Sequence, residues 1–260
     1  MLSLVSQYQQ VVGDLPRALS KVGKDPQVKR EVDYYLATID KIDTIDDFLK
    51  NDRLYRFAMK AFGLEEMTYA KAYMRKVLNE GIDDSTAFAR KLTDQRFYDF
   101  AETFNFKRYG AAATSFTRAQ AGTVDRYVRA TLEQQAGQQS EGLRLALYFQ
   151  RKAPSVTSAY GLLADSALYS VVRTALGLPA AVSGIDIDKQ AALIANRVDL
   201  KALRTPAGLG TFLTRFIAQY ERQNGTSAAA ASPAITVMQG VAANVGQSTL
   251  MALQNLKRGV

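Results

Sequence analysis

The side chains that most often carry enzyme chemistry are missing from this sequence. It contains no cysteine, no histidine and no tryptophan. Disulfides, thiolate nucleophiles, imidazole bases and the usual zinc ligands are therefore excluded together. What remains is carboxylates, lysines, tyrosines and hydroxyls without a recognisable catalytic spacing. We predict a protein that is not an enzyme, with no catalytic residues, no cofactor and no metal.

Two short motifs have part of the spacing of a ligand-binding loop. Asp186 and Asp188 open like a calcium loop, but Arg197 stands where a bidentate glutamate is needed. Gly208 and Gly210 lack the third glycine and the preceding strand of a dinucleotide loop. Acidic doublets lie at expected helix starts, where carboxylates favour the helix dipole: Asp46 with Asp47, Glu65 with Glu66, and Asp83 with Asp84. All of these motifs are better explained as helix ends.

The net charge of +8 is spread along the chain without a cluster of lysines and arginines. Such a distribution does not favour a specific nucleic-acid site. No stretch is apolar enough for a membrane span, and the first residues lack the features of a cleaved signal peptide. We expect protein partners, and a cytoplasmic location or export without a cleaved signal peptide.

A weak internal repeat is displaced by 114 residues. The first copy contains Tyr34, Leu49, Leu54, Tyr55, Ala61, Gly63 and Leu64, and these return as Tyr148, Leu163, Leu168, Tyr169, Ala175, Gly177 and Leu178. The shared positions are apolar or end a helix, so the repeat preserves packing and not a reaction centre. We expect Tyr55 and Tyr169 to be buried with a partner for each hydroxyl, and Gly63 and Gly177 to have positive φ.

Helix signals dominate the chain and strand signals are scarce. Caps are expected at Asp25, Thr44, Asp52, Ser158 and Asp165, since short polar side chains satisfy the first free N–H groups. Expected helices run from about 26 to 39, 45 to 49, 53 to 62, 66 to 79, 123 to 152 as one helix or a pair, 187 to 197 and 206 to 222, with further starts at 83–85 and 93–94.

The sequence thus predicts an all-α protein made of two related multi-helix units with flanking amphipathic helices. Its segments are an N-terminal helical segment at 1–24, a first helical unit at 25–106, a connector and linking helix at 107–140, a second helical unit at 141–223, a hinge at 224–232 and a C-terminal helix at 233–260.

Both terminal segments have apolar residues three or four positions apart. Those expected to contact a partner are Leu2, Val5, Tyr8 and Val12 at one end, and Ile235, Met238, Val245 and Leu256 at the other. Two interpretations are open for these helices. They either dock on the body of the protein or form a stalk that makes a homo-oligomer.

The first helical unit also carries a family resemblance. Its longest ordered strings are DPQVKREVDYYLATI, DDFLKNDRLYRFAMKAFGLEEMTYAKAYMRKVLNEG and FARKLTDQRFYDFAETFNF. This run, from 25 to 106, resembles a family of unknown function found mainly in alphaproteobacteria, whose genes often lie among flagellar and motility genes. The resemblance implies a place of action, the flagellar system, and supplies no catalytic or binding residues. It therefore implies flagellar protein partners, and a chain that is either cytoplasmic or exported to the flagellum without a cleaved signal peptide.

Two functions from different classes follow from these observations. The first is a non-enzymatic structural or assembly protein associated with the bacterial flagellum. The alternative is a soluble adaptor or regulator that binds a partner protein between the two helical units.

Overall fold

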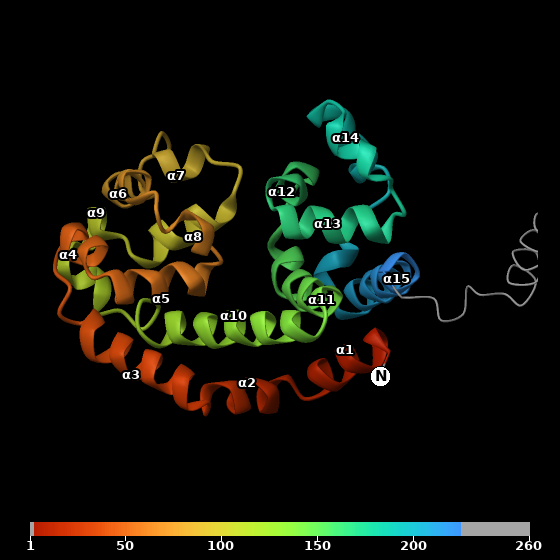
Figure 1. Cartoon of the computed structure of the whole chain (residues 1–260). Helices are drawn as coiled ribbons and strands as arrows, with labels where there is room; N and C mark the ends of the chain where they lie inside the picture. The colour runs from red at the N-terminus through yellow and green to blue at the C-terminus, as the bar shows by residue number, and fades with distance from the viewer. Residues whose placement is uncertain (1–2, 225–260) are drawn as a thin grey trace, which may run out of the picture. The chain divides into compact units, whose positions relative to one another are not determined.

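The computed structural model describes residues 3–224 of the 260-residue chain. Residues Met1–Gln219 form one compact body, and Tyr220–Val260 are a separate unit that lies mostly outside the described residues. All regular structure within residues 3–224 is helical, which confirms the expected all-α class (Figure 1). Of the expected hinge at 224–232, Asn224 is the last residue of a helix, and the rest of the hinge and the expected C-terminal helix at 233–260 lie outside the described residues.

The helices follow one another with short connections. The first part of the chain forms α1 (Leu4–Gly13), α2 (Leu15–Gly23), α3 (Pro26–Ile39), α4 (Ile45–Lys50), α5 (Asp52–Phe62), η1 (Glu65–Met67), α6 (Lys71–Glu80), α7 (Phe88–Lys91), α8 (Gln95–Thr103), α9 (Phe106–Tyr109) and η2 (Gly110–Thr114). The rest forms α10 (Ala121–Gln139), α11 (Glu141–Lys152), η3 (Ala153–Ser155), α12 (Ala159–Ala164), α13 (Ser166–Ala175), η4 (Ala180–Gly184), α14 (Ile187–Ala195), η5 (Ala202–Arg204) and α15 (Pro206–Asn224).

Two helices are buried on most of their surface and organise the body. α5 packs against α10, α3, α4 and α8, and α13 packs against α11 and α12 (Figure 1). In the core beside α5, the rings of Phe48, Phe62, Phe100 and Phe104 meet edge to face or tilted, with centroids 4.9 to 6.1 Å apart. Aromatic pairs prefer such geometries, so this cluster holds α4, α5 and α8 together.

Most expected helix starts are confirmed by side-chain caps. Asp25, Thr44, Asp94, Ser158 and Asp165 each accept a backbone N–H from the first turn of the following helix. The stretch from 123 to 152 is a pair of helices, α10 and α11, separated at Ser140. Local capping chemistry was therefore a reliable guide to where helices begin.

Three expected helix starts are wrong. The cap of α5 is Asn51 and not Asp52, which is the first residue of the helix. The helix expected from 66 begins only at Lys71, because Thr68 donates its hydroxyl to the Glu65 carbonyl at 2.8 Å and a short 3₁₀ turn forms first. No helix begins at 83–85, because Asp84 accepts the backbone N–H and hydroxyl of Thr86 in a local turn.

The N-terminal segment also differs from a single amphipathic helix. It breaks at Asp14, whose side chain accepts the backbone N–H of Arg17 at 3.1 Å and starts α2. Pro16 follows in the first turn of α2, where proline is tolerated. The apolar positions of α1 and α2 therefore lie on two helices with different directions.

The expected helix stops are confirmed. Gly63 has φ of 71° and Gly177 has φ of 64°. At both sites the next residue, Leu64 or Leu178, donates its N–H across the last turn, to the carbonyl of Met59 at 2.8 Å or of Arg173 at 2.9 Å. At each site this bond is part of a Schellman motif, which needs a left-handed residue at the glycine position.

A tyrosine bonds to a helix cap in both helical units. The Tyr34 hydroxyl donates to Asn51 at 3.1 Å, and the Tyr148 hydroxyl donates to Asp165 at 2.5 Å. Asn51 caps α5 and Asp165 caps α13, again 114 residues later. Such recurrence is what a duplicated unit would produce, although the duplication itself stays an interpretation of the sequence.

The expectation for the paired tyrosines was right only in part. Tyr55 is completely buried, but its hydroxyl has no hydrogen-bond partner within residues 3–224. Tyr169 is half-buried and accepts a hydrogen bond from Ser183 at 3.2 Å. The two positions differ because α5 is covered by α10, whereas the helix α13 that carries Tyr169 leaves part of this face open to solvent.

Candidate functional site

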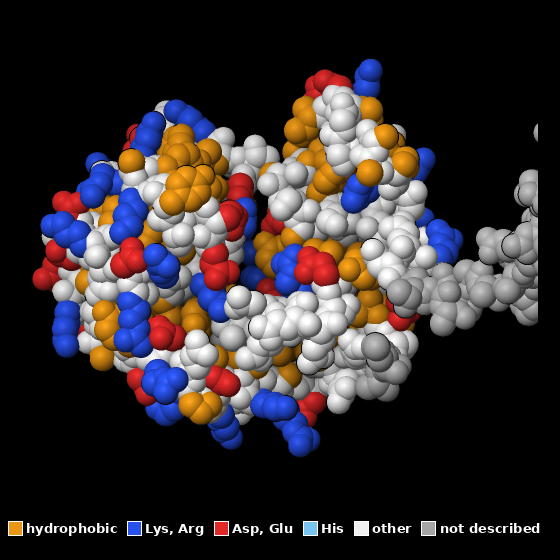
Figure 2. Space-filling model, viewed as in Figure 1, with side chains coloured by type: hydrophobic (Ala, Val, Ile, Leu, Met, Phe, Trp, Pro, Cys, Tyr) orange, Lys and Arg blue, Asp and Glu red, His pale blue; other side chains and the backbone are white. Residues whose placement is uncertain are grey.

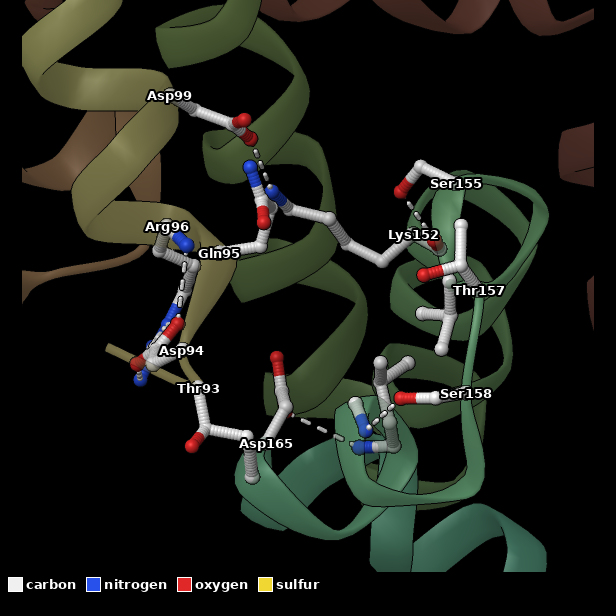
Figure 3. A pocket seen from close by; sticks show the side chains of 14 residues that line it. Thr93, Asp94, Gln95, Arg96, Asp99, Lys152, Ser155, Thr157, Ser158 and Asp165 are labelled. Carbon is white, nitrogen blue, oxygen red and sulfur yellow. Dashed lines mark hydrogen bonds and ion pairs between the residues drawn. The ribbon is translucent and has the colours of Figure 1, made fainter. Parts of the chain in front are cut away.

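A cleft of about 260 Å³ lies where the first helical unit meets the second (Figure 3). The first unit contributes the start of α8, and the second contributes the end of α11, α12 and the start of α13. Figure 2 shows a hollow between these two groups of helices with acidic and basic side chains on its walls. Its lining residues are Thr93, Asp94, Gln95, Arg96, Asp99, Lys152, Ser155, Val156, Thr157, Ser158, Gly161, Ala164, Asp165 and Leu168.

Arg96 is the most connected side chain of the cleft. Its guanidinium donates to Asp94 at 2.8 to 3.0 Å, pairs with Glu66 at 3.0 Å and also donates to the Gly63 carbonyl. Burial alone would lower the pKa of Arg96. The hydrogen bonds and negative charge of Asp94, together with the other partners of Arg96, have the larger combined effect, so the pKa of Arg96 lies above its ordinary value. Arg96 therefore stays charged and ties α8 to the end of α5.

Asp165 is the corresponding anchor in the second helical unit. Its carboxylate caps α13 by accepting two backbone N–H groups, and it accepts the Tyr148 hydroxyl at 2.5 Å. Only 7% of Asp165 is exposed. Burial, with the nearby Asp165 charge, raises the pKa of Tyr148, so this phenol remains a donor.

Lys152 connects the two sides of the cleft. Its ammonium lies 3.4 Å from the Asp99 carboxylate, and its side chain is 13% exposed (Figure 3). Burial lowers the pKa of Lys152, while Asp99 opposes this shift. An ammonium has three donors, so Lys152 can bond to a ligand and to Asp99 at once.

Three polar side chains of the cleft have hydrogen-bonding groups that the described chain does not use. Thr93, Gln95 and Thr157 make no side-chain hydrogen bond within the described part of the chain. The carboxylates of Asp94 and Asp165 already accept hydrogen bonds as helix caps, and Asp94 also pairs with Arg96. This arrangement favours a binding role over proton transfer. Among residues 3–224, no group of three acidic side chains could hold a metal ion. The cleft can recognise a polar group through hydrogen bonds.

The structure places only part of the predicted partner-contact set. Tyr8 and Val12 line a second cavity, between α1 and the start of α15, and Val5 is half-buried in α1. Leu2, Ile235, Met238, Val245 and Leu256 lie outside the described residues. None of the three contact residues that the structure describes, Val5, Tyr8 and Val12, lines the cleft.

Some cleft residues could be singled out from the sequence and others could not. Asp94, Ser158 and Asp165 were recognised as helix caps, although their place in a shared cleft was not. Arg96 and Lys152 had no distinctive spacing, because Glu66 and Asp99, which form ion pairs with them, lie in other helices.

Comparison with known proteins identifies the family. The model of a family described as "Protein of unknown function (DUF1217)" matches residues 61–209, a range that contains the whole cleft. The chain is also similar to the X-ray crystal structure of protein AGR_C_984 from Agrobacterium tumefaciens, with 45% identity over 85% of this chain and 94% of that chain and a TM-score of 0.78. A search of curated proteins gives no match.

This chain belongs to the DUF1217 family of proteins of unknown function. The matched range reaches beyond the 25–106 run that carries the resemblance seen in the sequence. Among the described helices, none combines the length and the apolar character that crossing a membrane requires.

Proposed function

We propose that this chain is a non-enzymatic structural or assembly protein associated with the bacterial flagellum. The flagellar context comes from the resemblance of residues 25–106 to a family whose genes often lie among motility genes. The structural support is that polar and charged side chains in and beside the cleft are bonded to other parts of the chain. Arg96, Tyr148 and Lys152 bond to Gly63, Asp165 and Asp99, and so join distant segments of the chain.

A building block needs such internal bonds, because it must keep its shape while other subunits pack against it. The cleft pairs link α5 to α8, α11 to α13 and α8 to α11. An enzyme would instead leave a reactive group poised beside a substrate. The absence of cysteine and histidine from the sequence points the same way.

A deletion strain scored for hook, filament and swimming tests the proposal. We expect loss of swimming with an incomplete hook or filament, restored by the full-length chain. The protein should also fractionate with purified basal bodies or appear in export-dependent culture supernatant. Normal flagella and normal swimming in the deletion strain would refute the flagellar assignment.

The alternative is an adaptor or regulator that binds a partner protein in the cleft. The open side chains of Thr93, Gln95 and Thr157 favour this second function, since they offer hydrogen bonds that the described chain does not use. An adaptor should remain in the cytosol of wild-type and filamentless cells alike, whereas a building block should not.

A substitution that fills the cleft tests the adaptor directly. Thr157→Arg places a long side chain in the cleft, and Thr117→Arg makes the same change at an exposed position outside it. If the cleft binds a partner, Thr157→Arg fails to restore swimming to the deletion strain and Thr117→Arg restores it. Equal rescue by both variants would contradict the adaptor function.

A further inference from the structure

The second cavity, of about 590 Å³, has a mainly apolar wall. It is formed by α1, the start of α2, part of α10, the junction of α11 with η3, the end of η5 and the start of α15. The apolar side chains that line it are Tyr8, Val12, Leu15, Pro154, Pro206 and Leu209. Cavities of about 300 to 1,000 Å³ with apolar walls and few polar groups are typical of small-molecule sites.

The charged residues that line this cavity are all arginines: Arg129, Arg151 and Arg204. Arg129 and Arg151 share one buried carboxylate, that of Glu133, at 3.1 and 2.7 Å. Two guanidinium groups against one carboxylate leave an excess positive charge in this triad. Arg204 is exposed, and its guanidinium makes no ion pair or hydrogen bond within residues 3–224.

Two further groups in the wall favour an anion. The Tyr8 side chain is half-buried, and its hydroxyl makes no hydrogen bond within the described residues. Burial raises the pKa of Tyr8 to about 12, against the opposing effect of Arg129, so the hydroxyl stays a donor at neutral pH. Thr205 and Pro206 place the start of the 19-residue helix α15 in the same wall, and the N-terminal end of a helix carries partial positive charge.

We propose that this cavity binds an amphiphile with one carboxylate head and an apolar chain. The head lies among the arginines and the Tyr8 hydroxyl, because guanidinium groups and a phenol donate charge-assisted bonds to a carboxylate. The chain lies along Val12, Leu15 and Leu209, where its burial removes apolar surface from water. This site is separate from the cleft and goes beyond the proposed function, so either can fail alone.

Calorimetric titration of the full-length protein with decanoate tests the proposal. We use decanol and decyltrimethylammonium as probes with the same chain and a neutral or positive head, all at pH 8 and below the concentrations at which they aggregate. Decanoate should bind with a stoichiometry of one, and both other probes at least about tenfold more weakly, since only decanoate brings the complementary charge. Absence of saturable decanoate binding, or equal affinity for decyltrimethylammonium, would overturn the proposal.

Two pairs of variants locate the site. Arg204→Glu should weaken decanoate binding at least about fivefold, whereas Arg197→Glu, the same change at an exposed arginine outside the cavity, should not. Tyr8→Phe removes only the hydroxyl and should weaken binding by a few-fold, with Tyr69→Phe at a surface position as its control. Circular dichroism checks that each variant is folded. Equal decanoate affinity in Arg204→Glu and Arg197→Glu would reject this cavity as the binding site.

Discussion

Tyr55 carries a buried hydroxyl that has no hydrogen-bond partner among the residues that the structure describes. A buried polar group without a hydrogen bond costs about 1 to 3 kcal/mol, so removing it should not destabilise the protein. We expect Tyr55→Phe to raise the free energy of unfolding by about 0.5 to 1 kcal/mol in chemical denaturation. Tyr35→Phe is the matched control, because the buried Tyr35 hydroxyl donates to the Ala119 carbonyl at 2.5 Å. That change should lower stability by about 1 kcal/mol, and a loss of stability in Tyr55→Phe would show that its hydroxyl is bonded.

Asp165 performs two tasks, as the cap of α13 and as the acceptor for Tyr148. Asp165→Asn keeps an acceptor for both and reproduces the side chain that Asn51 supplies at the related cap, so we expect a cost below about 1 kcal/mol. Asp165→Ala loses the cap and leaves the buried phenol unpaired, which should cost about 2 to 4 kcal/mol. Thermal and chemical unfolding of both variants measure the difference. Equal costs would mean that the charge of Asp165, and not its acceptor geometry, stabilises this site.

Alkaline pH should reduce the stabilising effect of Tyr148. Burial, followed by the Asp165 charge, raises its folded pKa above the unfolded value of about 10, so its contribution is complete below pH 10. Above pH 10 the unfolded state loses the proton first, and the contribution declines as pH rises toward the folded pKa. The destabilisation caused by Tyr148→Phe should therefore be about 0.8 kcal/mol smaller at pH 10.5 than at pH 8.

Tyr69→Phe provides the control for this pH effect, because Tyr69 is 83% exposed. Its effect on unfolding should be the same at both pH values. If the effect of Tyr148→Phe is also independent of pH, the phenol is not held in its neutral form by the fold.

At the scale of the element, the two glycine stops offer a direct comparison. Gly63 and Gly177 have positive φ, and a Cβ at either site would meet no atom closer than 3.8 Å. Valine there is therefore opposed by backbone strain and not by a clash, and we expect each Gly→Val change to cost more than about 1 kcal/mol. Gly23→Val, at the end of α2 where φ is not positive, should stay within about 0.5 kcal/mol. Similar unfolding free energies for all three variants would argue against the strain.

Helix ends were predictable where they depend on neighbouring residues. The caps at Asp25, Thr44 and Ser158 use bonds to residues two or three positions along the chain, and the sequence displays them directly. The start of α6 was not predictable in this way. It depends on the path of the chain after Gly63, where Glu66 forms an ion pair with Arg96 of another helix.

At the scale of the whole molecule, the sequence predicted the helical class but not its clefts. The repeat identified Tyr34 and Tyr148 as related positions, yet not that each bonds to a helix cap. Lys152 and Asp99 are 53 residues apart in the chain and meet only because the fold brings α8 near the end of α11. Sites built from such long-range pairs have no local pattern, so a single sequence cannot reveal them.

The terminal segments connect the fold to the proposed function. Among the described residues, every buried side chain lies between Leu4 and Ile217, and these side chains include a hydrophobic core. Removing 233–260, which lies outside the described residues, should leave a folded protein with a nearly intact helical signal in circular dichroism and the same unfolding midpoint. We predict that the apolar positions Ile235, Met238, Val245 and Leu256 contact a partner, and we expect the truncated chain to fail to restore swimming to a deletion strain. Full rescue of swimming by the truncated chain would refute a role for this segment in flagellar assembly, whereas a truncated chain that unfolds would show that the segment contributes to the core.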